Sequence, residues 1–223
     1  MKKYDAVIIG FGKGGKTLAG KLAGQGKKVA MIEKDAGMYG GTCINVGCIP
    51  SKSLVRSSGL AFNKKDASPE ERAADYGAAI DEKRRLTSML REKNFKKLDD
   101  LANVDVYNGT ASFVSNTVVE IKTSEETLEI EGEKIFINTG GTPVIPSIKG
   151  LEGNPYVYTS AELMDLREYP KQLVIVGGGY IGLEFSSMYS GFGTKVTVLQ
   201  DGEVLIPRED RDVAEAIQGV LEN

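Results

Sequence analysis

The sequence predicts an α/β fold, in which a parallel sheet is flanked by helices, with an inserted β-meander and the first part of a second, similar domain. The first observation behind this prediction is an internal repeat, because residues 6–33 align without a gap with residues 173–200. Each copy reads as a short apolar strand, a G-x-G-x-x-G turn, a segment of helical length, a Gly-rich turn and a second apolar strand. The second observation is the region between the copies, where residues 104–137 are rich in β-forming residues.

The first predicted strand begins close to the N-terminus. Its apolar run, residues 6–9, is too short for a signal peptide and ends at Gly10, so we expect a buried strand. No apolar stretch approaches the length that spans a bilayer, and we therefore expect a cytoplasmic protein without a membrane partner. The net charge of −3 gives no electrostatic reason to expect a nucleic acid as partner.

A long helix is expected between the two copies. Ser68 is suited to cap it, with Pro69 at the first helical position and Glu71 at the third, and the helical pattern continues to about Leu101. Its clusters of lysine and arginine could suggest polyanion binding, but interleaved acidic residues favour a solvated helix face.

The β-rich region follows this helix. Breaks at Asn108-Gly109, Ser115-Asn116 and Glu131-Gly132 suggest hairpins. The loop-like stretch from Gly140 to Pro155 marks a domain boundary. The sequence thus predicts a first domain of residues 1–150 and a second domain that begins within residues 151–223.

The two glycine motifs indicate two nucleotide sites. Gly-rich turns often make only a tight connection, but two copies in register, each within a βαβ unit, favour pyrophosphate binding at a helix N-terminus. At the end of the second strand, Glu33 fits a ribose without a 2′-phosphate, whereas Gln200 can bind a ribose and does not repel a phosphate. The motif glycines are Gly10, Gly12 and Gly15 in the first copy and Gly177, Gly179 and Gly182 in the second.

The two cysteines, Cys43 and Cys48, lie in a Gly-rich stretch, and the chain has no histidine. Structural zinc needs more ligands and shorter spacings, so no metal site is expected, and two buried inert cysteines are the plainer alternative. If a helical turn begins near Cys43, the spacing brings both sulfurs to one face within disulfide reach. A helix N-terminus there would lower the pKa of the thiol, and a longer helical segment is expected from Ser53 onward.

The segment GGTCINVGCIPSK, residues 40–52, closely resembles the redox-active disulfide segment of the class I flavoprotein disulfide reductases, which are pyridine-nucleotide–disulfide oxidoreductases. Dihydrolipoamide dehydrogenase, glutathione reductase and mercuric reductase belong to this class. The resemblance covers the whole chain. It implies a three-layer, Rossmann-like FAD-binding domain and the first part of a Rossmann-like NAD(P)-binding domain. It also implies an enzyme in which NAD(P)H reduces FAD, FAD opens the Cys43–Cys48 disulfide, and the thiols reduce an oxidised small substrate.

The resemblance assigns roles to particular residues. Cys43 would exchange with the substrate, and Cys48 would be the charge-transfer thiol against the flavin. Lys52 would lie near the flavin and pair with Glu184, and Tyr180 would cover the flavin until the nicotinamide displaces it. The plainer alternatives are a surface lysine, an ordinary helix carboxylate and core packing. The expected FAD contacts are Gly10, Gly12, Gly15, Glu33, Lys34, Gly41, Thr42, Ala111, Thr139 and Gly140, and the expected nicotinamide-nucleotide contacts are Gly177, Gly179, Tyr180, Ile181, Gly182 and Gln200.

A narrower resemblance is carried by the blocks YGGTCIN, LREKNFKKL, EGEKIFINTG and PREDRD. They are similar to the bacterial branch induced by reactive chlorine species, which contains the hypothiocyanous acid reductases and a flavoprotein also described as a copper(II) reductase. The expected substrate is therefore hypothiocyanous acid, a disulfide or a metal ion. Because the family is normally about twice this length, we expect a truncated chain. The acid–base histidine and the C-terminal domain that forms the homodimer would then lie outside it.

Several alternatives stay open on the sequence. The chain could be part of an NAD(P)H oxidase or metal-ion reductase with incidental cysteines, or a flavin- and NAD(P)H-binding fragment without turnover. The choice between NADH and NADPH is also undecided. Gln200 tolerates NADPH, whereas Gly182 and the lack of an arginine pair directly after Gln200 favour NADH, with Arg208 the nearest downstream arginine.

Overall fold

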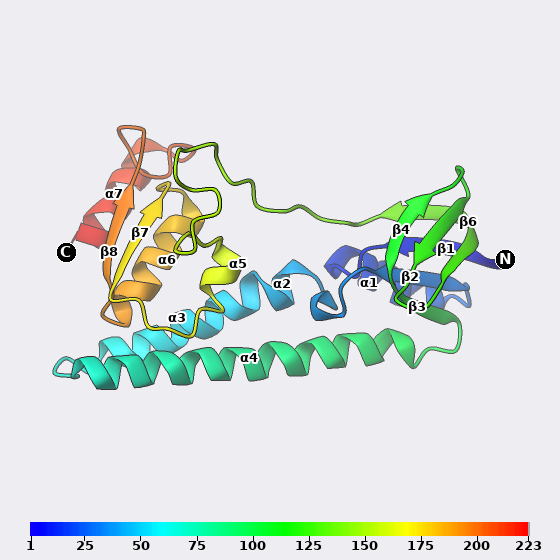
Figure 1. The fold of residues 1–223 in the computed structure, drawn as a ribbon, viewed down its shortest axis with the longest axis horizontal. Coiled ribbons are helices and arrows are strands. Elements are labelled where there is room, and N and C mark those ends of the chain that lie inside the picture. Colours follow the sequence, from blue (N-terminus) through cyan, green and yellow to red (C-terminus); the bar gives the residue numbers. More distant parts are fainter. Residues whose placement is uncertain (223) are drawn as a thin grey trace. The chain divides into compact units, whose positions relative to one another are not determined.

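The computed structural model describes residues 1–222, which form two compact units (Figure 1). The first unit contains Met1–Pro50 and Arg84–Thr159, and the second contains Ser51–Lys83 and the chain from Ser160 onward. This division follows the packing of the chain. The predicted boundary after residue 150 concerns the two nucleotide-binding domains and stays a prediction.

A six-stranded sheet with the order β3-β2-β1-β6-β5-β4 forms the centre of the first unit. Strands β1 (Lys2–Ile9), β2 (Val29–Glu33), β3 (Val104–Asn108) and β6 (Thr127–Ile137) run parallel to one another. Strands β4 (Thr110–Phe113) and β5 (Val118–Lys122) extend the sheet in antiparallel pairing. The predicted α/β fold with an added β-meander is confirmed.

Both faces of β1 are buried, as expected for a central parallel strand. Ala6 and Ile8 pack on one face with helix α1 (Lys13–Gly24), and Val7 packs on the other face with Val119 of β5. The second half of helix α4 (Pro69–Asp99) adds Leu98 to the α1 side. The sheet therefore holds the Gly-rich turn between β1 and α1 on a rigid support.

The structure corrects two of the three predicted hairpins. The break at Ser115-Asn116 does join the antiparallel pair β4–β5. The break at Asn108-Gly109 separates β3 from β4, but β3 pairs in parallel with β2 instead of folding back. Glu131-Gly132 lies inside β6, where a Cβ on Gly132 would come within 2.7 Å of Val7 Cγ2. This glycine permits close packing of β6 on β1 and makes no turn.

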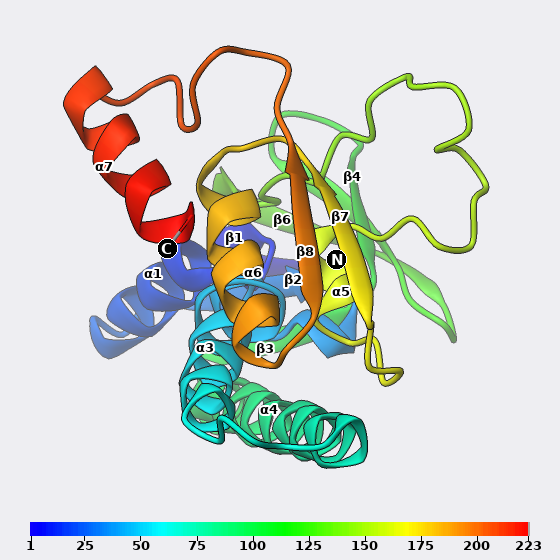
Figure 2. The ribbon, with the colours of Figure 1, turned by 90° about the vertical axis from the view of Figure 1, so that its left-hand side faces the viewer.

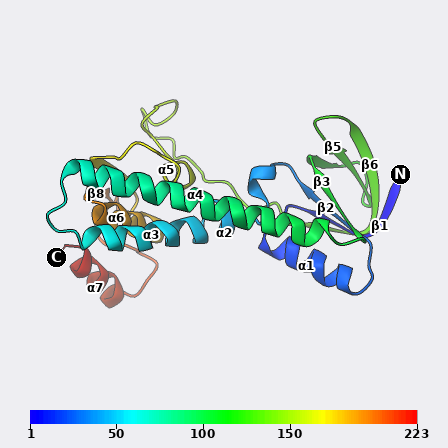
Figure 3. The same cartoon turned by 90° about the horizontal axis from the view of Figure 1, so that it is seen from below.

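In the second unit, helix α6 (Tyr180–Gly191) covers one face of the parallel pair β7 (Gln172–Val176) and β8 (Lys195–Leu199), as Figure 2 shows. Helix α3 (Cys48–Phe62) runs alongside the first half of α4 (Figure 3). Tyr76 of α4 packs against Tyr189 and Phe192 in the core of this unit. Helices α5 (Ser160–Leu163) and α7 (Arg211–Glu222) complete it.

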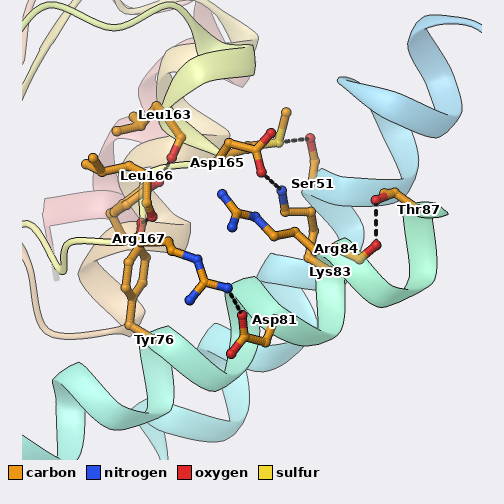
Figure 4. A network of polar contacts seen from close by, with 12 residues as sticks. Ser51, Tyr76, Asp81, Lys83, Arg84, Thr87, Leu163, Asp165, Leu166 and Arg167 are labelled. Carbon is orange, nitrogen blue, oxygen red and sulfur yellow. Dashed lines mark hydrogen bonds and ion pairs between the residues drawn. The ribbon is translucent and has the colours of Figure 1, made fainter. Parts of the chain in front are cut away.

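Short polar contacts fix the segment after α5 to α4 (Figure 4). Lys83, whose side chain is only 3% exposed, forms an ion pair with Asp165, and Arg167 pairs with Asp81. Tyr76 Oη donates a hydrogen bond of 2.8 Å to the carbonyl of Leu166. Within residues 1–222, no helix is long and apolar enough to cross a membrane.

The predicted start of α4 is confirmed in detail. Ser68 N donates to Glu71 Oε2 at 2.7 Å, and Glu71 N donates to Ser68 Oγ at 3.2 Å. This reciprocal pair is the capping box that the sequence predicts, with Pro69 as the first helical residue.

Candidate active site

The first Gly-rich turn forms a close cradle at the start of α1. Gly10 has a φ of +106°, and a Cβ there would lie 2.2 Å from the carbonyl oxygen of Asn138. A Cβ on Gly15 would lie 2.6 Å from the carbonyl oxygen of Gly10. Gly12 caps α1 without any side-chain hydrogen bond, so the backbone N–H groups of the first turn face outward without a protein cap. Such a turn fits a pyrophosphate.

Asn138 is a site residue that the sequence reasoning missed. Its Nδ2 donates to the carbonyl of Gly10 at 2.9 Å, and its amide lies over the positions where Cβ atoms of Gly12 and Gly15 would be. It follows β6 and reaches β1 only through the sheet, with Asn138 N donating to Ile9 O at 2.8 Å. This long-range pairing has no local sequence signal.

Glu33 ends β2 beside the same turn. Its Oε2 accepts a hydrogen bond of 2.9 Å from Phe11 N, the residue between the first two motif glycines. The carbonyl of Glu33 accepts from Gly109 N at 2.9 Å, which brings the start of β4 next to it. Ala111 of β4 packs against the sheet core on that side. The predicted ribose and adenine contacts of the FAD site therefore lie around one strand end.

The other predicted FAD contacts differ in how closely they approach this turn. The backbone of Thr139 approaches Gly10, where a Cβ would lie 3.2 Å from Thr139 Cα, whereas no atom lies within 4 Å of a Cβ on Gly140. A Cβ on Gly41 would lie 2.5 Å from Gly12 Cα, so the cysteine loop rests on the Gly-rich turn. Lys34 and Thr42 are exposed.

The cysteines lie near the starts of two separate helices. Helix α2 (Thr42–Asn45) starts at the predicted place but ends before Cys48, which is the first residue of α3. The expected helical turn near Cys43 is present, but the longer helix begins at Cys48 and not at the predicted Ser53. Asn45 is the physical reason for the ordered loop, because its Nδ2 donates to the carbonyls of Tyr39 and Gly41 at 3.1 and 3.0 Å.

Both thiols are free, with Cys43 half-buried and Cys48 exposed. A side-chain hydrogen bond with Cys48 raises the pKa of Cys43, and burial and the charge of Cys48 raise it further. Lys13 and Lys16 oppose this effect and lower it. The expected net lowering of the pKa of Cys43 is thus wrong for the dithiol form, because the thiol neighbour outweighs the cations.

The second Gly-rich turn repeats the geometry of the first. Gly177 has a φ of +102°, Gly179 caps α6 without a side-chain hydrogen bond, and a Cβ on Gly182 would lie 2.3 Å from the carbonyl oxygen of Gly177. Gly178 N donates to Gln200 Oε1 at 2.7 Å, the counterpart of the contact between Phe11 and Glu33. The two copies thus match in contact geometry as well as in sequence.

Four further predicted site residues lie in this unit. Tyr180, 58% exposed, donates a hydrogen bond to Glu209, and Ile181 is also exposed. Lys52 forms an ion pair with Glu184, which is the pairing that the family resemblance implies. The exposure of Tyr180 argues against core packing, while its role at the flavin stays a prediction.

The donor set of the first unit fits an FAD. The outward N–H groups of α1 suit its pyrophosphate, and the Glu33 carboxylate suits a ribose. Bound FAD would supply two-electron transfer between a nicotinamide and a disulfide. Within the described part of the chain, no group of three or more His, Cys, Asp or Glu residues is arranged to hold a metal ion.

Comparison with known proteins gives one consistent result. The profile of the family "Pyridine nucleotide-disulphide oxidoreductase" matches residues 4–223. The probable pyridine nucleotide-disulfide oxidoreductase RclA of Escherichia coli K12 is 49% identical over 221 residues, which are 99% of this chain and 47% of that protein. Mercuric reductase of Lysinibacillus sphaericus is 34% identical over 223 residues, which are 98% of this chain and 40% of that protein.

Comparison with solved structures supports the same family. The Cu(II) complex of the HOCl-induced flavoprotein disulfide reductase RclA from Escherichia coli superimposes with a TM-score of 0.90 at 48% identity, covering 100% of this chain and 48% of that chain. The chain spans about half the length of the curated relatives it matches. With its profile match, its duplicated nucleotide turns and its paired cysteines, the chain belongs to the pyridine nucleotide-disulphide oxidoreductase family.

Proposed function

We propose that the chain supplies the flavin site, the redox-active thiol pair and part of the nicotinamide-nucleotide site of an NAD(P)H-dependent oxidoreductase. The observation that carries this proposal is the packing of the loop before Cys43 on the Gly-rich turn of the first unit, where a Cβ on Gly41 would lie 2.5 Å from Gly12 Cα. A pair of thiols beside a flavin site can cycle between dithiol and disulfide. This property separates the proposed activity from simple nucleotide binding.

The proposed substrate is an oxidised small molecule, such as hypothiocyanous acid, a disulfide or a metal ion. Relatives named as mercuric reductase and glutathione reductase, and the Cu(II) complex of an HOCl-induced reductase, support this range. The chain's own residues do not separate the three classes, because each would approach the same thiols.

For a disulfide substrate, the thiols act in two steps. The Cys43 thiolate attacks one substrate sulfur and expels the other as a thiolate. The Cys48 thiolate then attacks Cys43 in the mixed disulfide and expels the second substrate thiolate, which leaves a Cys43–Cys48 disulfide. Two electrons pass from the protein to the substrate, and the disulfide must be reduced again in each cycle.

The chain itself contains no histidine that could act as the acid–base group. We place the acid–base histidine in a further domain outside this chain, contributed across a homodimer, as the family resemblance implies.

We place the protein in the cytoplasm, since a thiol pair that must be reduced in every cycle suits a reducing compartment.

Anaerobic titration with NADH, followed by visible absorbance, tests the proposal. The FAD-loaded protein should develop a long-wavelength charge-transfer band, which Cys48→Ser removes and Cys43→Ser retains. If the band is absent, and Cys48→Ser behaves as the wild type, the thiol mechanism is wrong.

The same variants separate the rival functions. An oxidase or metal-ion reductase with incidental cysteines predicts that Cys43→Ala leaves turnover unchanged with each oxidant. A nucleotide-binding fragment without turnover predicts bound FAD but no reductase activity until the remaining part of the protein is supplied. The span of about half of the relatives' length is the observation that favours this second candidate for the isolated chain.

A further inference from the structure

The loop that carries Cys43 is fixed against the first turn of α1. Gly40 N donates to the carbonyl of Phe11 at 3.1 Å. A Cβ on Gly41 would lie 2.5 Å from Gly12 Cα and 3.4 Å from Lys13 N. Cys43 follows two residues later, and the lysines at positions 13 and 16 follow Gly12 in α1. The fold therefore packs the loop that carries the thiol and the first turn of α1, which carries both lysines, into one cluster.

The second half of α4 holds both sides of this cluster. Arg91 Nε donates to Asn45 Oδ1 at 2.9 Å, and Asn45 in turn fixes the carbonyl of Gly41 at 3.0 Å. One turn further along α4, Asn94 accepts a hydrogen bond from Lys16 Nζ. Asn94 is itself oriented, because its Nδ2 donates to the carbonyl of Leu90. The Lys16 side chain is thus anchored, which reduces the entropy lost when it interacts with a charge.

The charges around the thiol have opposing effects. Cys48 and burial raise the pKa of Cys43, whereas Lys13 and Lys16 lower it. Around Lys16, burial lowers the pKa of the amine, Cys43 raises it, and Lys13 and Lys97 lower it. Cys43 and Lys16 therefore each favour the charged form of the other.

We propose that Lys13 and Lys16 are positioning residues of the thiol site, which stabilise the Cys43 thiolate while Asn94 anchors Lys16. This inference rests on the proposed function, in which Cys43 attacks the oxidised substrate. Only the thiolate is the nucleophile, so the two lysines set the fraction of Cys43 that can react. Lys16 is half-buried and anchored, while Lys13 is exposed and more strongly screened by salt.

The test measures the pH dependence of alkylation by iodoacetamide in a Cys48→Ser background, where Cys43 is the remaining thiol. In the double variant Lys13→Met/Lys16→Met, the midpoint of the pH profile of alkylation should move to higher pH. The alkylation rate at neutral pH should fall about 3- to 10-fold, as expected for a pKa change of about half to one unit. Lys16→Arg should keep the rate, because it keeps the charge. Lys21→Met is the matched control on the exposed last turn of α1 and should change nothing.

The outcomes separate this inference from the proposed function. An unchanged midpoint in the double variant overturns it, as does an equal shift in Lys21→Met. Reduced FAD retention with an unchanged midpoint would assign the lysines to the flavin phosphates and also overturn it. If the double variant does not fold by circular dichroism, the single variants Lys13→Met and Lys16→Met decide in the same assay. A failed charge-transfer titration with a shifted midpoint would reject the proposed function and leave the lysine effect intact.

Discussion

At the scale of single residues, Gln200 and Glu33 show how one atom changes a nucleotide site. Both accept a hydrogen bond from the backbone of their Gly-rich turn, at 2.7 and 2.9 Å. Gln200 carries an amide nitrogen where Glu33 has its second carboxylate oxygen, and this Nε2 donates to Asp201 Oδ1 at 3.1 Å. The negative charge at this strand end is therefore carried by the neighbouring Asp201, which is exposed.

This arrangement predicts a preference for NADH. A carboxylate beside the ribose repels a 2′-phosphate, so Asp201→Asn should tighten the binding of 2′,5′-ADP about 3- to 10-fold while changing that of ADP little. Isothermal titration calorimetry with both ligands measures the ratio. Glu203→Gln, in the same loop, controls for a general change in charge. Equal effects of the two variants, or none from Asp201→Asn, would show that the carboxylate does not select the nucleotide.

At the scale of elements, the sequence predicts local devices better than pairings between distant segments. The capping box of α4 is local, and each Gly-rich turn also has a local contact, because a Cβ on Gly15 or Gly182 would meet the carbonyl oxygen five residues earlier. Gly132 was misplaced in a turn, since a glycine in a strand gives the same local signal as a glycine in a hairpin. Its close approach to Val7 depends on how β6 pairs with β1, which the neighbouring residues do not encode.

The candidate active site shows the same difference between local signals and contacts between distant segments. The motif glycines, Glu33 and the cysteines were visible in the sequence. The hydrogen bonds of Asn138 and Asn45 were not, because an asparagine has no distinctive pattern before its partners are known. The break between α2 and α3 was missed for the same reason, since Asn45 fixes the loop through backbone carbonyls upstream.

The strands β1 and β3 offer a test of pH dependence across an element. Tyr4 of β1 donates a hydrogen bond to Asp105 of β3, and Lys2 pairs with the same carboxylate. The Tyr4 hydrogen bond, with Lys2, holds the pKa of Asp105 below its ordinary value of 3.8, although partial burial opposes this. A lowered pKa means that this stabilisation is present above pH 3.8 and is lost as the pH falls through the folded-state pKa.

We therefore expect Asp105→Asn to lower the free energy of unfolding at pH 7 by about 1 kcal/mol, a modest value because the carboxylate is partly exposed. Urea unfolding at pH 7 and at pH 3 measures the difference, which should shrink at the lower pH. Glu125→Gln, in an exposed turn, is the control and should show no such trend. A difference that does not depend on pH would assign the effect of Asp105 to packing instead of charge.

At the scale of the whole molecule, the two copies of the nucleotide turn lie in different compact units, and each closes on its own strand. A Cβ on Gly15 would meet the carbonyl of Gly10, and a Cβ on Gly182 would meet that of Gly177. In each case the alanine must push the helix away from the strand that supports it. Since backbone cannot yield as a flexible side chain can, the damage should stay with the turn that carries the substitution.

We therefore expect each substitution to weaken the binding of one nucleotide and to leave the binding of the other unchanged. Gly15→Ala should weaken FAD binding at least about tenfold, or about 1.4 kcal/mol, and leave the affinity for NADH nearly unchanged. Gly182→Ala should do the reverse. Gly24→Ala controls for the first helix, because no atom lies within 4 Å of its Cβ, and it should retain both ligands. Flavin absorbance after gel filtration and NADH fluorescence report the two sites separately. If either substitution abolished both, the turns would not be independent sites, and the duplication would describe ancestry alone.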